Sequence, residues 1–169
     1  MEAVNKIIPF NSPIEMGLRL LFLFKNTEKE GLDLQRLIYY NYLLVHTSDV
    51  SDLPGAPKSL HPNLPDRSGE ILISRKIIES GVKLLLSKGL ICIGYTKTGI
   101  KYKRNDETKP FLEYFESKYS KELDKNANWV CKTFDKMQDE KLNDFMTKNL
   151  GKWGSEFSID YRVMGDENA

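Results

Sequence analysis

Two histidines are the first residues whose type and position could support chemistry. His46 and His61 flank a proline-rich stretch, and Asp49, Asp52 and Asp66 lie nearby in the sequence. Imidazole and carboxylate groups bind zinc and other divalent metals, so His46, Asp49, His61 and Asp66 can be drawn as one metal site. None of their spacings matches a known ligand pattern, however, and neither cysteine is close in sequence. We therefore expect these side chains to form hydrogen bonds within a loop, and we predict no metal.

Other catalytic patterns are weaker still. Neither histidine stands in a recognisable serine or cysteine nucleophile motif. The close glycine pairs, Gly94 with Gly99 and Gly151 with Gly154, lack the strand-to-helix setting and the lysine of a phosphate-binding loop. Adjacent carboxylates in the C-terminal third stand among lysines and asparagines, which is typical of a solvated helix face. The sequence therefore predicts a protein that is not an enzyme and needs no cofactor.

A basic segment is the strongest remaining signal. Residues 67–104 contain nine lysines and arginines against two acidic residues, although the whole chain has a net charge of only +1. Such an excess is typical of a surface that meets an anionic partner, with a solvated lysine-rich face as the alternative. Seven basic side chains are the candidates for contact with DNA: Arg75, Lys76, Lys83, Lys97, Lys101, Lys103 and Arg104. Phosphate contacts of this kind supply affinity without sequence specificity.

Three helices are predicted in the first half of the chain. Ser12 is a good N-cap with Pro13 in the first turn and Glu15 three residues after the cap, so a helix is expected over residues 12–25. Apolar residues at helical spacing predict a second helix over 33–45 and a third over 70–88. Gly81 inside the third helix is expected to weaken it. This third helix is mostly aliphatic, which disfavours the reading of base edges.

A hairpin is predicted directly after the third helix. Residues 90–95 and 100–104 alternate between apolar and polar side chains across a four-residue connection. The alternation places Ile91, Ile93 and Tyr95 on the same face as Ile100 and Tyr102.

The C-terminal third is predicted to be helical. Residues 111–150 contain no glycine or proline, and a weak break at 125–128 divides them into two helices. Strict alternation over 157–163 predicts a short strand. The predicted fold is therefore α+β and mostly helical. It consists of a winged-helix-like domain over residues 1–105, with a long proline-rich loop at 47–69, and a helical extension over 106–169 that ends in the strand.

Two segments are predicted to meet partner proteins. The first helix is apolar on nearly every side, so Leu20, Leu23 and Phe24 are expected to be covered partly by another subunit. The prolines of the 47–69 loop stiffen it in advance, which lowers the entropy lost when it docks. Within that loop Leu60, Leu64 and Arg67 are the candidate contacts, with Arg67 as a charged anchor.

Composition limits where such a protein works. The 169 residues include 8 Phe, 8 Tyr and 2 Trp, which favours a folded chain. The longest strictly apolar run, residues 20–24, is far shorter than the roughly 20 residues of a membrane span. No signal-peptide pattern opens the chain, and Cys92 and Cys131 form no disulfide framework. We expect a cytoplasmic protein that does not enter a membrane.

Several blocks of the sequence resemble one known family. They are FNSPIEMGLRLLFLF at 10–24, LDLQRLIYYNYLLVHTSDV at 32–50 and SLHPNLPDRSGEILISRKIIESGVKLLLSKGLI at 59–91. Together they resemble the small middle component of bacterial ABC-three-component systems, which includes the small subunit of Lamassu-type anti-phage and anti-plasmid defence. The resemblance covers residues 10–105.

This resemblance implies a function that composition cannot. It implies a winged-helix adaptor that links an SMC-like ABC ATPase to a toxic effector, often a nuclease, and restrains the effector until foreign DNA is sensed. The implied partners are the ATPase, the effector and DNA bound non-specifically through the complex. A stand-alone winged-helix transcription regulator is the alternative.

Overall fold

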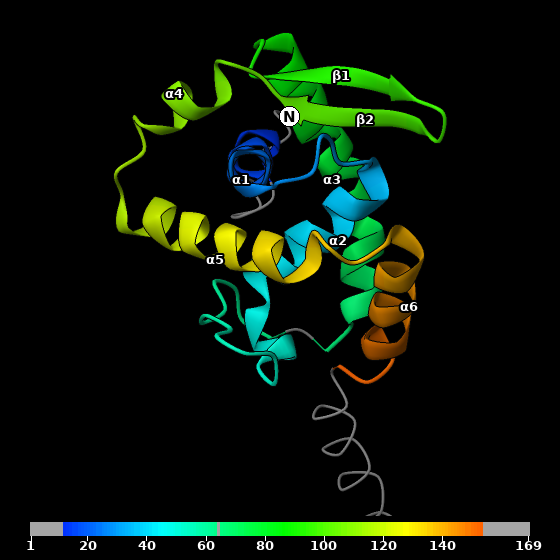
Figure 1. Ribbon diagram of the computed structural model, residues 1–169. Coiled ribbons are helices and arrows are strands. Elements are labelled where there is room, and N and C mark those ends of the chain that lie inside the picture. The colour runs from blue at the N-terminus through cyan, green and yellow to red at the C-terminus, as the bar shows by residue number, and fades with distance from the viewer. Residues whose placement is uncertain (1–11, 64, 154–169) are drawn as a thin grey trace, which may run out of the picture.

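The computed structural model describes residues 12–63 and 65–153. Over these residues the fold is α+β and mostly helical, as predicted, with a single two-stranded sheet (Figure 1). The elements are α1 (Pro13–Asn26), α2 (Leu34–Val45), the 3₁₀ helix η1 (Thr47–Val50), α3 (Arg67–Ser87), β1 (Ile91–Thr96), β2 (Gly99–Arg104), α4 (Thr108–Leu112), α5 (Lys118–Phe134) and α6 (Asp139–Leu150). None of the helices in this part of the chain has the length and apolar character that a bilayer span requires.

Helix α1 lies at the centre of the fold. It begins as predicted, because the Ser12 hydroxyl accepts a hydrogen bond from the Glu15 amide at 3.1 Å. It packs against α2, α3, α4, α5 and β2, and this enclosure explains why it is apolar on nearly every side (Figure 1). Leu20, Leu23 and Phe24 are 0% exposed. The expectation that these three side chains need a partner to cover them is therefore wrong, since the chain's own helices do so.

The crossing of α1 and α3 is unusually close. A Cβ atom added to Gly81 would lie 3.0 Å from Cγ of Met16 and 3.2 Å from the amide nitrogen of Gly17. Gly17 faces the same contact, where an added Cβ would meet Leu85 at 3.3 Å. The absence of a side chain at Gly81 therefore lets α1 and α3 pack closely, which offsets the low helix propensity of glycine.

The hairpin has the predicted pairing. Ile93 lies opposite Tyr102, and Tyr95 lies opposite Ile100. The connection consists of residues 97–98, two residues shorter than predicted, because Thr96 and Gly99 also pair. The segment between α1 and α2 joins this sheet through a β-bridge, in which the backbones of Leu32 and Tyr102 exchange hydrogen bonds of 2.9 and 2.8 Å.

The C-terminal helices depart from the prediction. The expected break at 125–128 lies inside α5, and the chain turns instead at 135–138. Asn126 lies in the predicted break, because asparagine is unfavourable inside a helix. Its buried amide, however, donates to the carbonyls of Leu44 and Lys58, both at 3.1 Å. These tertiary bonds satisfy the side chain within the helix. The predicted strand at 157–163 lies outside the described residues.

The stretch predicted as a long proline-rich loop contains regular structure at its start. It contains η1, and the amides of Leu60 and His61 both donate to the carbonyl of Val45 at 3.0 Å. Helix α3 begins three residues before the predicted start, because the carboxylate of Asp66 caps it through the amide of Gly69 at 2.8 Å.

Candidate partner-binding surface

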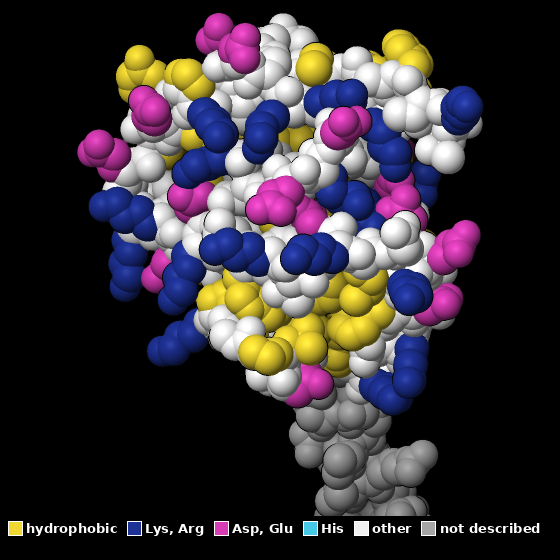
Figure 2. All heavy atoms as spheres, viewed as in Figure 1, with side chains coloured by type: hydrophobic (Ala, Val, Ile, Leu, Met, Phe, Trp, Pro, Cys, Tyr) yellow, Lys and Arg dark blue, Asp and Glu magenta, His cyan; other side chains and the backbone are white. Residues whose placement is uncertain are grey.

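The basic side chains of α3 are accessible. Arg75, Lys76 and Lys83 are exposed, and Arg75 forms a surface ion pair with Glu79 at 3.5 Å. Figure 2 shows that Lys and Arg alternate with Asp and Glu over much of the face in view. That face carries mixed charge rather than a surface of one sign.

The basic side chains of the hairpin are largely occupied. Nζ of Lys101 lies 2.8 Å from a carboxylate oxygen of Asp33 and 3.8 Å from one of Asp139. The guanidinium of Arg104 donates to the backbone carbonyls of Lys25 and Thr27, both at 3.1 Å. Lys103 is half-buried, and Lys97 at the tip is exposed. Two of the side chains predicted to contact DNA, Lys101 and Arg104, therefore already bind groups of the chain itself.

Arg67 does not face a partner. Its side chain is fully buried and forms an ion pair with Asp49, with Nη2 at 3.0 Å from Oδ1 and Nε at 3.2 Å from Oδ2. The predicted role of Arg67 as an exposed anchor is therefore wrong. Leu60 is half-buried against the core, and Leu64 lies outside the described residues.

The four side chains that could be drawn as a metal site have separate roles. The rings of His46 and His61 approach edge to face, with centroids 6.0 Å apart. Asp49 instead pairs with Arg67, and Asp66 caps α3. Within residues 12–63 and 65–153 there is no group of three or more His, Cys, Asp or Glu side chains placed to hold a metal ion.

An apolar groove crosses the surface where α1, the end of α3 and the α4–α5 segment meet. It has a volume of about 930 Å³. Twelve residues line it: Ser12, Ile14, Glu15, Leu18, Leu21, Leu84, Leu85, Lys88, Leu90, Phe111, Phe115 and Tyr119. Ile14 is 75% exposed and Phe111 is 36% exposed, although both are large apolar side chains. Contiguous exposed apolar surface of this kind marks protein interaction sites.

Sequence reasoning missed this groove. Its walls come from three segments that lie far apart in the chain, so no local pattern brings them together. One signal was available, since Ile14 is an apolar residue in the first turn of α1 and precedes the buried stripe that begins at Met16.

The comparison with family models identifies the chain. The model of the ABC-three component (ABC-3C) system Middle Component 2 family matches residues 9–156. The chain belongs to this family. Against the curated proteins and against the solved structures it gives no match. The match confirms the resemblance at the level of a middle component, and it extends beyond residue 105 to include α4, α5 and α6.

Membership in the Middle Component 2 family indicates that some of the exposed surface contacts other proteins. A middle component works in a system of several components, so it needs surfaces for partner proteins. The apolar groove is a suitable surface, because its exposed side chains lie outside the core that stabilises the chain itself.

Proposed function

We propose that this chain is a non-catalytic adaptor subunit of a bacterial defence complex. In this proposal it links an SMC-like ABC ATPase to a toxic effector, often a nuclease, and restrains the effector until foreign DNA is sensed, as in Lamassu-type systems. Membership in the Middle Component 2 family supports a role within a multi-component ABC system. The complex would work in the cytoplasm.

The apolar groove is the observation that carries the proposal. An amphipathic helix of a partner subunit fits it, because such helices place apolar side chains at intervals of three and four residues into hydrophobic grooves. Lys88 supplies a positive charge among the lining residues, which favours an acidic side chain at one end of the docked helix. We place the occupant on the ATPase or the effector.

The proposal includes a winged-helix-like domain over residues 1–105. Three helices followed by a hairpin support it, and so does the bridge between Leu32 and Tyr102, which adds the α1–α2 connection to the edge of the sheet. Contact with DNA would then be non-specific and would use exposed cations such as Arg75, Lys76, Lys83 and Lys97. A stand-alone transcription regulator is less well supported, because the family is defined by its place in a multi-component system.

Co-expression with the neighbouring genes tests the proposal. The groove variant carries Ile14→Glu, and the matched control carries Leu72→Glu. Ile14 and Leu72 are both 75% exposed, but only Ile14 lines the groove. We expect the groove variant to retain less than a tenth of the ATPase or effector on affinity purification, whereas the control retains wild-type amounts.

Both variants should keep the wild-type melting temperature to within about 2 °C, since exposed substitutions usually change stability by less than about 0.5 kcal/mol. Undiminished recovery of partners by the groove variant would assign the docking site elsewhere. Failure of the wild-type chain to purify with any neighbouring product would overturn the adaptor proposal itself.

A further inference from the structure

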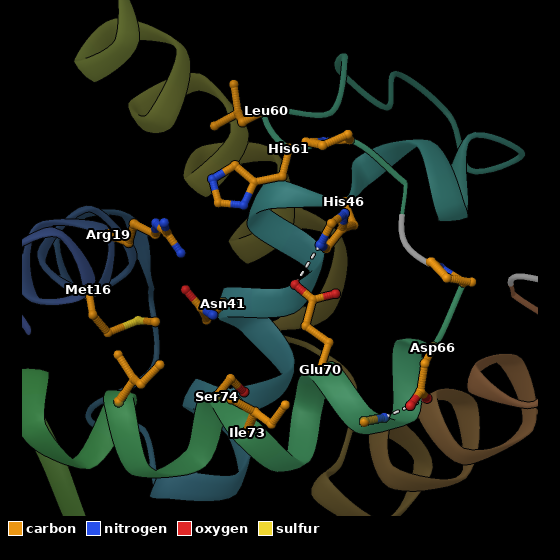
Figure 3. A pocket seen from close by; sticks show the side chains of 14 residues that line it. Met16, Arg19, Asn41, His46, Leu60, His61, Asp66, Glu70, Ile73 and Ser74 are labelled. Atoms are coloured by element: carbon orange, nitrogen blue, oxygen red, sulfur yellow. Dashed lines mark hydrogen bonds and ion pairs between the residues drawn. The ribbon is translucent and has the colours of Figure 1, made fainter. Parts of the chain in front are cut away.

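A second cavity lies on the other side of α1, between α1, α2, α3 and the segment that precedes α3. Its volume is about 550 Å³, which is in the range of small-molecule sites. Figure 3 shows polar side chains entering it from three directions: Arg19 from α1, Asn41 from α2, and Glu70 from α3. Apolar side chains such as Leu60, Ile73 and Ile77 form much of the remaining wall.

Among the residues that the structure describes, two buried side-chain oxygens of this cavity accept no hydrogen bond. They are Oδ1 of Asn41 and Oε2 of Glu70. Asn41 is only 4% exposed. A buried acceptor without a donor is unfavourable, and a charged one more so. Two such oxygens around one cavity favour a ligand that supplies donors.

Both atoms act as acceptors only, because one belongs to a carboxylate and the other is an amide oxygen. The other carboxylate oxygen of Glu70, Oε1, accepts a hydrogen bond from Nε2 of His46 at 2.8 Å. The group that complements this set is a donor without acceptor atoms, and an ammonium or guanidinium is such a group.

The other charges in the cavity agree with a cationic ligand. Arg19 forms an ion pair with Glu15 at 2.7 Å, so a carboxylate already balances its charge. His61 is neutral near pH 7, because burial, Arg19 and His46 lower its pKa to about 4. Asp66 adds a second carboxylate at the wall of the cavity. An anionic ligand would meet the repulsion of Glu70 and Asp66.

We propose that this cavity binds an organic cation. Its ammonium or guanidinium group donates hydrogen bonds to Glu70 and Asn41, and its carbon chain lies against Leu60, Ile73 and Ile77. The cation is either a free metabolite or the side chain of a lysine or arginine on another protein, since both carry the same chemistry.

Titration of the full-length chain with three probes tests this inference. The probes are butylguanidinium, its uncharged isostere butylurea, and a Gly-Arg-Gly peptide with blocked ends. We expect butylguanidinium to bind in the micromolar to low millimolar range by calorimetry, with butylurea at least tenfold weaker. If the peptide binds at least tenfold more tightly than butylguanidinium, the source is a protein side chain. If it binds equally or more weakly, the source is a free metabolite.

Two variants and one control localise the site. Glu70→Gln removes the charge but keeps an acceptor for His46, and it should weaken butylguanidinium binding at least tenfold. Ser74→Leu leaves Glu70 in place and fills part of the cavity, since Ser74 lines it, and it should weaken both cationic probes. Glu79→Gln, on the same helix but outside the cavity, should bind like the wild type.

Two results would overturn the inference. One is that neither cationic probe binds the wild-type chain. The other is that both bind Glu70→Gln and Ser74→Leu as tightly as they bind the wild type. Neither result bears on assembly with partner subunits, so the adaptor proposal is tested separately.

Discussion

The guanidinium of Arg67 meets both carboxylate oxygens of Asp49, at 3.0 and 3.2 Å, beneath the surface of the protein. The hydroxyl of Tyr42 also donates to Asp49. Burial, reinforced by this hydrogen bond and by the charge of Asp49, raises the pKa of Tyr42 well above its usual range, so the phenol stays protonated. The pair joins η1 to the first turn of α3 and so fixes both ends of the proline-rich segment.

Breaking this pair should destabilise the fold. Because both side chains are buried, Arg67→Ala leaves the charge of Asp49 without its ion pair and Asp49→Ala removes two hydrogen-bond acceptors from Arg67, and we expect each change to cost about 3–5 kcal/mol in urea unfolding. The double variant should cost clearly less than the sum. Arg75→Ala provides the control, since its exposed pair with Glu79 should contribute less than about 1 kcal/mol. Additive single effects would show that the two side chains do not interact.

Stability should fall as the pH drops from about 6.5 towards 4, in part through His61. Its pKa is about 4 in the folded chain, lowered by burial, Arg19 and His46, against about 6.5 when unfolded. The unfolded chain therefore binds more protons in this window, and stability is lost as the pH falls. The loss should be on the order of 2 kcal/mol between pH 7 and pH 4.5.

His61→Gln isolates this contribution. Gln does not titrate, so urea unfolding of the variant should depend less on pH over the same window. A slope equal to that of the wild type would assign the pH dependence to other groups.

Lys101 and Lys97 should respond differently to charge reversal, although both are hairpin lysines. Lys101→Glu places a carboxylate beside Asp33, which caps α2, and near Asp139, so we expect a loss of about 1–2 kcal/mol. Lys97→Glu should leave the melting temperature unchanged, because Lys97 is exposed at the tip. Thermal denaturation of the two variants side by side is the measurement. Equal melting temperatures would indicate that the Lys101 ion pairs contribute nothing.

Gly81→Ala should destabilise the protein although alanine has the higher helix propensity. The propensity gain is about 1 kcal/mol, but the new methyl group would crowd the backbone of Gly17 at 3.2 Å and separate α1 from α3. We expect a net cost of about 1–3 kcal/mol. Ser80→Ala, at the exposed neighbouring position, should be neutral or slightly stabilising. Stabilisation by Gly81→Ala would show that the two helices have room to relax.

Most local elements over residues 12–104 follow from the sequence. Ser12, Pro13 and Glu15 mark the start of α1, and apolar spacing marks α2 and most of α3. The alternation in β1 and β2 predicts which side chains pair across the hairpin. These features depend on neighbours within a few residues, through backbone caps and side-chain periods, and such signals can be read along the chain.

Only the tertiary structure decided which of these side chains are available. The sequence presents Leu20 to Phe24 as an apolar run and Arg67 as a loop cation, and the fold buries both. Asn126 lies inside α5 because carbonyls of Leu44 and Lys58, more than sixty residues away, accept its hydrogen bonds. The apolar groove and the cavity that Glu70 lines are likewise assembled from distant segments. Burial and charge pairing are properties of surfaces that meet in space, so no local pattern specifies them.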